Sequence, residues 1–401
     1  MANNNNTKNL NVPTLRFPEF TGEWKLVQLS QIADFVGGGT PSSSNASFWN
    51  GSIPWISSSD IKDGNIYDIS ITRFITKEAI DKSTTKLCPA PVILLVSRVG
   101  VGKVALSNKK LCTSQDFCNL INIKCNPNFL AYDLVRTMKQ KSREAQGTSI
   151  KGVTSYEIQK IRFWLPEKKK EQDKIATFLS LLDHRIATQN KIIEKYESLI
   201  KGINEKLLIN KKEYTTYRLS DICEIRSGYS GTQLTGTQGL MVSRIETISK
   251  HCINLDKVGY VKPFDSSADF KLHIGDILFS NINSVQYIGN TAFVDREYDL
   301  YHGMNLLRLI PRKIVEPFYV FLLLNTAKYK IHFQSICNKA ISQASINQTE
   351  LGKTVIHIPD LLYQKQICQL YNSLYNKKNI ENLYLQALKQ QKNHLLRQMV
   401  I

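Results

Sequence analysis

The chain has 401 residues, which exceeds what one hydrophobic core usually supports, so two or more domains are expected. Its apolar content of 42% is that of a globular protein, and its formal charge of +18 at pH 7 indicates a polyanionic partner, because unneutralised charge of one sign repels itself. No apolar run is long enough for a membrane span, the start has no secretory signal pattern, and the eight cysteines form no C-x-x-C pair. These features exclude membrane and secreted classes and favour a cytoplasmic protein with reduced thiols.

The first globular domain is predicted over residues 14–166, after a polar arm over residues 1–13 that is expected to be disordered. It opens with an amphipathic segment over residues 26–35 that is typical of a short helix, and a glycine-rich turn follows at residues 37–41. A second helix is predicted over residues 129–140. Strands are predicted at four apolar runs: 53–56, 92–97, 119–124 and 161–165.

A heptad pattern predicts one long helix over residues 167–212. Apolar residues recur at alternating steps of four and three from Ile175 to Leu207, with Gln189 as a polar exception at the middle. The apolar residues of this seam are Ile175, Leu179, Leu182, Ile186, Ile193, Ile200 and Leu207. A second, less regular series that includes Leu388 and Leu395 predicts another long helix over residues 360–401, paired antiparallel with the first. The alternative partner for the first helix is a second copy of the protein.

The second half of the sequence repeats the first half in the same order. Residues 29–32 align with residues 219–222, Ile93 aligns with Asp276, Asn119 with Asn305, and Gln172 with Gln364. A tandem duplication therefore predicts a second globular domain over residues 213–359. The fold class is α+β: two similar mixed α/β domains separated by two long antiparallel coiled-coil helices, with a pseudo-two-fold relation between the halves.

Several motifs resemble the target-recognition domains of specificity subunits of type I restriction-modification systems. They are Gly38–Ser42, Phe48–Ile56, Ser97-Arg98 with Gly100 and Gly102, and the segment from Leu165-Pro166 through Glu171-Gln172 to Leu182-Asp183. The second half keeps a weaker form of the last signature at Ile358-Pro359 and Gln364-x-Gln366-Ile367.

The resemblance implies a non-catalytic, DNA-binding subunit of a bacterial defence system. Each globular domain would read one half of a split target on double-stranded DNA, and the helices would set the spacer and dock two modification (methyltransferase) subunits. Restriction subunits, which are translocases and nucleases, would join them. No cofactor is implied for this chain; S-adenosylmethionine belongs to the modification subunits, and ATP and Mg to the restriction subunits. Half-site centres one DNA turn apart would leave about 5–8 unread base pairs.

Polar side chains in the predicted loops are the candidate DNA contacts, because Arg pairs with guanine and Asn or Gln with adenine. In the first domain the candidates are Thr40, Ser42, Ser57, Lys62, Arg98, Lys103, Gln115, Lys151 and Thr154. In the second domain they are Arg226, Tyr229, Arg244, Asn281, Asn283, Gln286, Tyr287, Gln343 and Asn347. The alternative for each is an ordinary solvated loop residue.

Two functions of other classes stay open at this point. Phe35–Gly39 fits the F-x-G-x-G pattern of S-adenosylmethionine pockets and Asn126–Phe129 echoes the N-P-P-F of adenine methyltransferases, which would suit a free-standing adenine DNA methyltransferase. The glycines follow a predicted helix instead of a buried strand, so turns are the favoured interpretation. The third function is a partnerless two-headed DNA-binding regulator. The sequence offers no catalytic residue and no histidine or cysteine spacing typical of a metal site.

Overall fold

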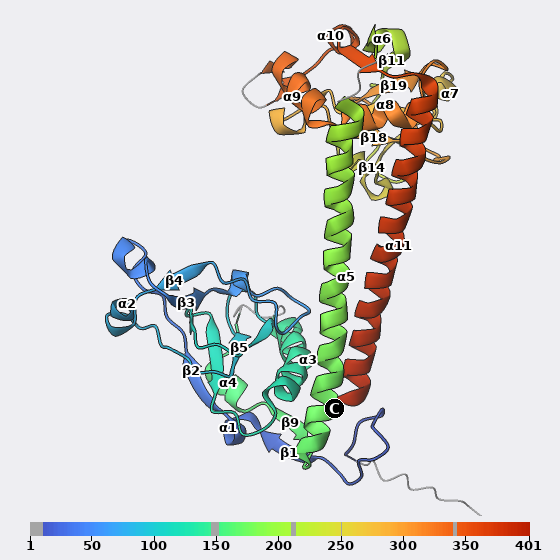
Figure 1. The fold of residues 1–401 in the computed structure, drawn as a ribbon. Coiled ribbons are helices and arrows are strands. Elements are labelled where there is room, and N and C mark those ends of the chain that lie inside the picture. Colours follow the sequence, from blue (N-terminus) through green and yellow to red (C-terminus); the bar gives the residue numbers. More distant parts are fainter. Residues whose placement is uncertain (1–10, 146–151, 210–213, 250, 340–342) are drawn as a thin grey trace, which may run out of the picture. The chain divides into compact units, whose positions relative to one another are not determined.

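The computed structural model describes residues 11–145, 152–209, 214–249, 251–339 and 343–401, with no side chains described at 145, 204–209 and 249. The chain divides into two compact units. Unit 1 consists of residues 1–191 together with residues 383–401, and unit 2 of residues 192–382. Each unit contains one globular domain and one part of each of the two long helices (Figure 1).

A four-stranded antiparallel sheet is the centre of unit 1. In spatial order its strands are β2 (Asp34–Gly37), β8 (Phe117–Ile121), β5 (Val92–Val96) and β6 (Val104–Ser107). Side chains of the fully buried β5 alternate between two cores, as the two-residue period of a strand requires. Ile93 and Leu95 pack with Phe129 of helix α3 (Pro127–Ala145), whereas Leu94 packs with Ile56 on the other face.

Smaller elements complete the globular domain of unit 1. A three-stranded sheet contains β4 (Arg73–Ile75), β3 (Ile53–Ile56) and β7 (Cys112–Thr113). A two-stranded sheet pairs β1 (Lys25–Gln28) with β9 (Arg162–Leu165). The short helices are α1 (Leu29–Ile32), α2 (Lys77–Asp81), α4 (Ser155–Gln159) and the 3-10 turns η1 (Ala46–Trp49) and η2 (Ser58–Asp60).

Unit 2 repeats this arrangement. Its four-stranded sheet has the order β11 (Cys223–Ser227), β19 (Leu307–Pro311), β16 (Ile277–Phe279) and β18 (Thr291–Phe293). The two-stranded sheet is β10 (Thr215–Arg218) with β22 (Val355–Ile358), and α6 (Leu219–Ile222) and α10 (Gln348–Gly352) take the places of α1 and α4. Two helices, α8 (Pro317–Leu324) and α9 (Ala327–Ile336), stand where unit 1 has α3.

Unit 2 differs most from unit 1 in its short strands and turns. Strands β12 (Leu240–Val242) and β15 (Gly259–Val261) pair antiparallel as β3 and β4 do, and the turns η3 (Ile245–Thr247) and α7 (Ser267–Phe270) follow them as η2 and α2 follow β3 and β4. The additional strands are β13 (Ile248–Ser249), β14 (Cys252–Ile253), β17 (Ile282–Asn283), β20 (Asn338–Lys339) and β21 (Ala344–Ser345), and the additional turns are η4 (Leu255–Lys257) and η5 (Val285–Tyr287). The duplicated framework is therefore the four-stranded sheet with its helical cover, and the differences lie in the connections.

The strand registers correct two of the alignments between the halves. Ile93 lies opposite Leu120 in unit 1, and Ile277 lies opposite Leu309 in unit 2. Ile277, not Asp276, is thus the counterpart of Ile93. By the same registers Asn119 corresponds to Arg308 instead of Asn305. At Ile93 the alignment failed because a one-residue slip exchanges the two faces of a strand while leaving an apolar run apolar. At Asn119 it failed by three residues, because a matching Asn-Leu pair recurs at Asn305.

Two long helices, α5 (Lys169–Ile209) and α11 (Leu361–Met399), run antiparallel. In unit 1, Arg185 Nη2 donates to the Tyr384 hydroxyl over 2.6 Å, while Asp183 pairs with Lys392 further along α11. In unit 2, Lys378 forms an ion pair with Glu197 at 3.0 Å. The expected pairing of the first helix with the chain's own C-terminal helix is confirmed.

Burial supports the predicted seam along both helices. The buried members are Ile175, Leu179, Leu182, Ile186, Ile193, Ile200 and Leu388, and Gln189 is buried with them. Leu395 is only half-buried, because the irregular C-terminal series turns its neighbour Leu396 into the core instead. Leu207 lies where side chains are not described.

The beginning of the chain differs from the sequence prediction. The expected arm extends through residue 13, yet Val12 packs on the core of unit 1, Pro13 is buried, and Asn11 accepts a backbone hydrogen bond from Trp24 at 2.9 Å. Residues 1–10 lie outside the described part. The predicted helix over residues 26–35 is wrong: the segment splits into β1, α1 and β2, because sheet pairing at both ends overrides its helical pattern.

Candidate nucleic-acid interface

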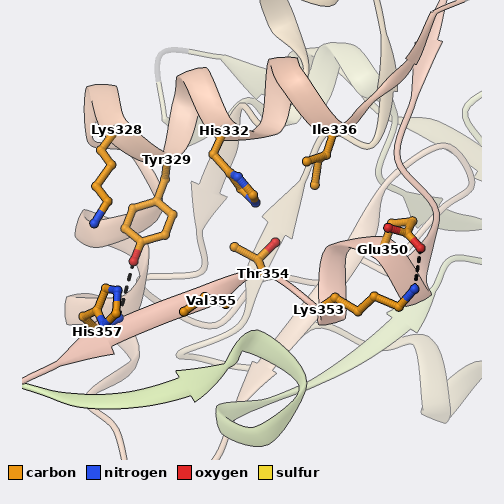
Figure 2. A pocket seen from close by; sticks show the side chains of 9 residues that line it. All are labelled: Lys328, Tyr329, His332, Ile336, Glu350, Lys353, Thr354, Val355 and His357. Carbon is orange, nitrogen blue, oxygen red and sulfur yellow. Dashed lines mark hydrogen bonds and ion pairs between the residues drawn. The ribbon is translucent and has the colours of Figure 1, made fainter.

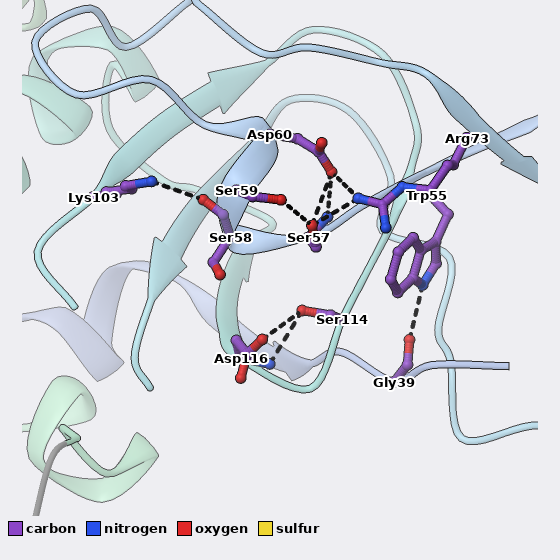
Figure 3. A network of polar contacts seen from close by, with 10 residues as sticks. All are labelled: Gly39, Trp55, Ser57, Ser58, Ser59, Asp60, Arg73, Lys103, Ser114 and Asp116. Atoms are coloured by element: carbon purple, nitrogen blue, oxygen red, sulfur yellow. Dashed lines mark hydrogen bonds and ion pairs between the residues drawn. The ribbon is translucent and has the colours of Figure 1, made fainter. Parts of the chain in front are cut away.

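A polar network holds the loop that follows β3 in unit 1 (Figure 3). The Arg73 guanidinium donates to the Asp60 carboxylate and, over 2.6 Å, to the Ser57 hydroxyl. Asp60 also accepts the Ser57 backbone N–H at 2.7 Å. The Arg73 guanidinium lies 4.6 Å from the ring centre of Trp55, whose indole N–H donates to the carbonyl of Gly39. A loop held at so many points presents its exposed atoms in one fixed arrangement.

Lys103 belongs to the same part of unit 1. Its ammonium donates to the carbonyl of Ser58 over 3.0 Å, so the predicted contacts Ser57 and Lys103 come together on one loop. Arg73 completes this group with a side chain that is 39% exposed. Arg73 was not among the predicted contacts, because it lies in a strand opposite Trp55 and its partner Ser57 is distant in sequence, so no sequence signal marked it.

Four other predicted contacts of unit 1 are exposed and bonded to neighbours. Thr40 donates its hydroxyl hydrogen to the Gln115 side-chain oxygen, which brings these two candidates together. Ser42 shares a hydrogen bond with Ser44. Lys62 forms a long ion pair with Asp68 at 3.6 Å, with both side chains solvated, so this pair contributes little to stability.

Two further candidates lie near each other on the connection before α4. The Arg98 side chain is exposed and has no ion-pair partner among the residues that the structure describes. Val153 donates a backbone hydrogen bond to Ser97 at 2.8 Å, which places the segment before Thr154 beside Arg98. The Thr154 hydroxyl caps α4 by accepting from the N–H of Glu157. Lys151 lies outside the described residues.

In unit 2 a small sheet and the turns beside it collect five of the predicted contacts. Strand β17 carries Asn283 and pairs with β21, which follows the exposed Gln343. Asn281 precedes β17 and donates its amide to the Ile346 carbonyl at 3.2 Å. Gln286 and Tyr287, in the turn after β17, are exposed. Asn283 donates to the Ser280 hydroxyl at 3.2 Å.

The remaining candidates of unit 2 have separate surroundings. The Tyr229 ring stacks on Phe264 at 3.9 Å between ring centres, and the Arg226 guanidinium is held by Glu224 at 2.6 Å. Arg244 is exposed at the start of η3. Asn347 caps α10 by accepting from the N–H of Glu350 at 2.8 Å, as Thr154 caps α4.

A repeated glutamine contact connects each globular domain to its long helix. The Gln172 amide donates to the Pro166 carbonyl at 2.8 Å, and its side-chain oxygen accepts the Asn126 N–H at 2.9 Å. Gln364 makes the same pair of contacts, with the carbonyl of Pro359 at 2.8 Å and the N–H of Glu316 at 2.9 Å. Both glutamines are buried, so each stabilises one buried carbonyl and one partly buried backbone N–H.

Unit 1 also contains a buried charged network between the helix pair and the globular domain. Asp183 pairs with Lys392, and their side chains are 1% and 8% exposed. The Tyr132 hydroxyl donates to Asp183 at 2.8 Å, and Lys392 donates to the Gly64 carbonyl at 2.8 Å. Desolvation, reinforced by the Asp183 charge, raises the pKa of Tyr132, so its hydroxyl keeps the proton that it donates.

The structure also bears on the methyltransferase motifs. The glycines of the F-x-G-x-G pattern follow a strand and not the expected helix, because Phe35 and Gly37 belong to β2. A Cβ at Gly39 would lie 2.5 Å from the Thr84 carbonyl carbon, so this glycine allows two backbones to approach each other. The Asn126 side-chain oxygen accepts the Phe129 N–H at 2.9 Å, and its amide donates to Asp173 at 2.6 Å, so Asn126 caps α3. Close backbone packing at Gly39 and the cap at Asn126 give structural roles to residues of both motifs.

Groups of His, Cys, Asp and Glu that could hold a metal do not occur among the described residues, and none of the described helices is long and apolar enough to cross a membrane. All eight cysteines are free thiols, and seven of them are buried.

The sequence and the fold both match known proteins. The chain is 38% identical over 193 residues to the type I restriction enzyme MjaX specificity subunit of Methanocaldococcus jannaschii, a match that spans 47% of this chain and 45% of that one. It is 27% identical over 342 residues to the MjaIX specificity subunit of the same organism, covering 73% and 78%. A match to the EcoR124I/EcoR124II specificity subunit of Escherichia coli has 31% identity over 215 residues and spans 51% of this chain and 49% of that one. The chain thus spans about half the length of two of these relatives.

Two solved structures share the fold. The S subunit of a type I restriction-modification system from M. genitalium aligns with a TM-score of 0.56 and 15% identity, covering 97% of this chain and 99% of that one. A chain from a study of complex assembly and conformational transition of the type I R-M system gives 0.60 and 16%, covering 93% and 96%. The family profile of the type I restriction modification DNA specificity domain matches twice, at residues 21–198 and 211–390. Since these two segments include both sheets, both glutamine contacts and most of both long helices, the chain belongs to the type I restriction modification DNA specificity domain family.

Proposed function

We propose that the chain is the DNA sequence-recognition subunit of a type I restriction-modification complex, in which each globular domain reads one half of a bipartite target. The observation that carries the proposal is a repeated framework with different loops. Both units keep the same strand order and the same glutamine contact, whereas the polar residues at equivalent places differ. The turn after β3 in unit 1 carries Ser57, and the turn after β12 in unit 2 carries Arg244. Arg98 follows β5 in unit 1, where Asn281 and Asn283 follow β16 in unit 2. Two globular domains with the same framework and different polar loop residues are expected to recognise two different half-sites.

The reading surfaces include side chains of the types that contact base edges. Arg73 and Arg98 offer guanidinium groups for guanine in unit 1, and Asn283 and Gln286 offer amides for adenine in unit 2. The net charge of +18 supplies the general attraction to phosphate. Thr154 and Asn347 are assigned to helix capping, since each side-chain oxygen is already used by a backbone N–H.

The two long helices are proposed to set the spacer and to dock two modification subunits. Both helices expose large apolar side chains in each unit. Exposed apolar side chains on neighbouring turns are typical of surfaces that bind another protein. In unit 1 these side chains are Leu181, Leu383 and Tyr384, and in unit 2 Leu199, Leu361, Leu362, Leu370 and Ile380. Catalysis, S-adenosylmethionine, ATP and Mg are assigned to the modification and restriction subunits, and this chain is proposed to be non-catalytic.

The test is a domain exchange in the assembled methyltransferase. Residues 14–165 are replaced by the corresponding domain of another family member, with residues 383–401 taken from the same donor because Lys392 contacts Gly64. Mapping of methylated adenines should show one altered half-site and one unchanged half-site. The matched control exchanges residues 213–359 and should alter the other half-site only. A target that is unchanged in both exchanges would refute the assignment.

The spacer is tested by length. One heptad added after Ile193, with a matching heptad in α11, lengthens both helices by about 10.5 Å, which corresponds to about three base pairs. The unread gap should widen by that amount while both half-sites stay the same. A heptad in α5 alone is the control and should abolish recognition, because the seam keeps its face while the two helices differ in length by about 10.5 Å.

A further inference from the structure

Unit 2 contains a cavity of about 300 Å³ between α9, α10 and β22 (Figure 2). This volume is at the lower end of the range for small-ligand sites. Lys328, Tyr329 and His332 reach it from α9, and Lys353, Thr354 and His357 reach it from the other side. None of these residues belongs to the proposed reading surfaces, and the proposed function gives the cavity no role.

Two buried polar atoms at this cavity have no hydrogen-bond partner among the described residues: Nε2 of His332 and the hydroxyl oxygen of Thr354. Thr354 is 2% exposed. In Figure 2 the two side chains lie on facing segments, His332 on α9 and Thr354 directly before β22. An unpaired buried hydroxyl costs about 1–3 kcal/mol, so two such groups at one cavity indicate that something binds there.

The first half of the chain shows that the fold does not need these polar residues. Leu29 donates its N–H to the carbonyl of Ile161, and Leu219 donates to the carbonyl of Thr354, both at 2.9 Å. Ile161 therefore occupies the position of Thr354 in unit 1, where it is buried in the core. The register of β9 and β22 likewise places Trp164 where unit 2 has His357. Unit 2 has a hydroxyl and an imidazole where unit 1 has two apolar side chains.

The groups around the cavity are mostly hydrogen-bond donors. The Tyr329 hydroxyl accepts the His357 N–H at 3.4 Å and keeps its own hydrogen to donate. Lys328 is exposed and has no ion-pair partner among the described residues. The single lining carboxylate, Glu350, is already bonded to Lys353 at 2.7 Å. Ammonium, hydroxyl and imidazole groups around one space match the oxygens of a tetrahedral oxyanion.

We propose that this cavity binds a phosphate group, with the Thr354 hydroxyl and His332 Nε2 at its floor and the Lys328 ammonium at its rim. The phosphate comes either from a free phosphate ion or monoester, or from a nucleic-acid backbone. Burial lowers the pKa of His332, so the ring is neutral before phosphate enters. A bound anion favours the protonated ring and raises that pKa.

The probe is inorganic phosphate, added to the full-length chain labelled with ¹⁵N-histidine at constant ionic strength in chloride. The His332 resonance, identified by its absence in His332→Gln, should shift and saturate with a dissociation constant of about 1 mM. Thr354→Val and Lys328→Met should each weaken binding about tenfold. Lys313→Met, which removes an exposed lysine outside the cavity, should leave binding unchanged. Thr354→Val should fold normally, as Ile161 does at the same place.

A DNA duplex distinguishes the two sources of phosphate. A duplex that displaces phosphate from His332 identifies a backbone phosphate as the ligand, whereas undisturbed phosphate binding identifies a free phosphate or monoester. A His332 shift that does not saturate well above 1 mM overturns the proposal, and so does a saturable shift that survives both Thr354→Val and Lys328→Met. Either result is independent of the domain exchange, which tests target recognition alone.

Discussion

The substitution Lys392→Met tests the buried network of unit 1. It removes the ammonium that faces Asp183, a carboxylate whose side chain is 1% exposed, and leaves the Tyr132 hydroxyl as the remaining donor identified at that carboxylate. It also leaves the Gly64 carbonyl without its lysine. Removing one partner of a buried ion pair typically costs 3–5 kcal/mol, because the other charge stays buried without compensation. We expect unit 1 to lose about that much stability.

The assay is native-state amide hydrogen exchange, since a chain of two units has no single free energy of unfolding. The slowest amides of β5 should exchange faster by roughly two to three powers of ten, while those of β16 in unit 2 stay unchanged. Lys378→Met on the same helix is the matched control. Its pair with Glu197 has side chains that are 25% and 55% exposed, so its loss should cost at most about 1 kcal/mol.

The double substitution Asp183→Asn with Lys392→Met should recover part of the loss, because no charge is then left in the core. The reasoning is refuted if Lys392→Met costs no more than Lys378→Met, or if unit 2 is destabilised as much as unit 1.

Three further outcomes are expected. Gln172→Leu should lower the protection of amides against hydrogen exchange by about 1–3 kcal/mol in unit 1 only, and Gln364→Leu by a similar amount in unit 2 only. The reason is that each substitution leaves two backbone groups without their hydrogen-bond partner. Equal effects of one substitution on both units would contradict separate contacts. Thr154→Ala and Asn347→Ala should each cost about 1 kcal/mol, measured by local exchange, with the methylated target unchanged; an altered target would assign them to base reading. Burial lowers the pKa of His302 from 6.5 to about 4, so the unfolded chain binds a proton that the folded chain does not, and unit 2 should lose roughly 3 kcal/mol as the pH falls from 6.5 to 4. His302→Gln should flatten that pH dependence, as followed by exchange in β19.

The duplication and the long helices could be predicted from the sequence because each is a pattern of apolar residues that burial imposes. The heptad positions from Ile175 to Ile200 had to be buried once a second helix was present. The exact alignment of Ile93 could not be predicted, because its neighbours on both sides are apolar and only pairing with Leu120 fixes the register.

Polar residues were harder to assign, because the same side chain suits several purposes. Thr154 and Asn347 have the chemistry of base readers and of helix caps, and the structure uses them as caps. Arg73 was missed because its partners Ser57 and Asp60 are distant from it in sequence. The contact between Gln172 and the Asn126 backbone could not be predicted either. Every residue except proline has a backbone N–H, so the identity of residue 126 gives no sign that its N–H is bonded to a glutamine.

The division of the chain between its units has a consequence for biosynthesis. Unit 2 is one continuous stretch, whereas unit 1 combines the first part of the chain with its last 19 residues, from Leu383 to Ile401. Leu396, Met399 and Val400 are buried in the unit 1 core, and the Leu15 N–H donates to the Gln398 carbonyl at 2.9 Å. Unit 1 therefore cannot be completed until all of unit 2 has been synthesised. A stop codon directly after Asn382 would remove these contacts from unit 1, although unit 1 is begun first, and would leave the whole stretch of unit 2 in place.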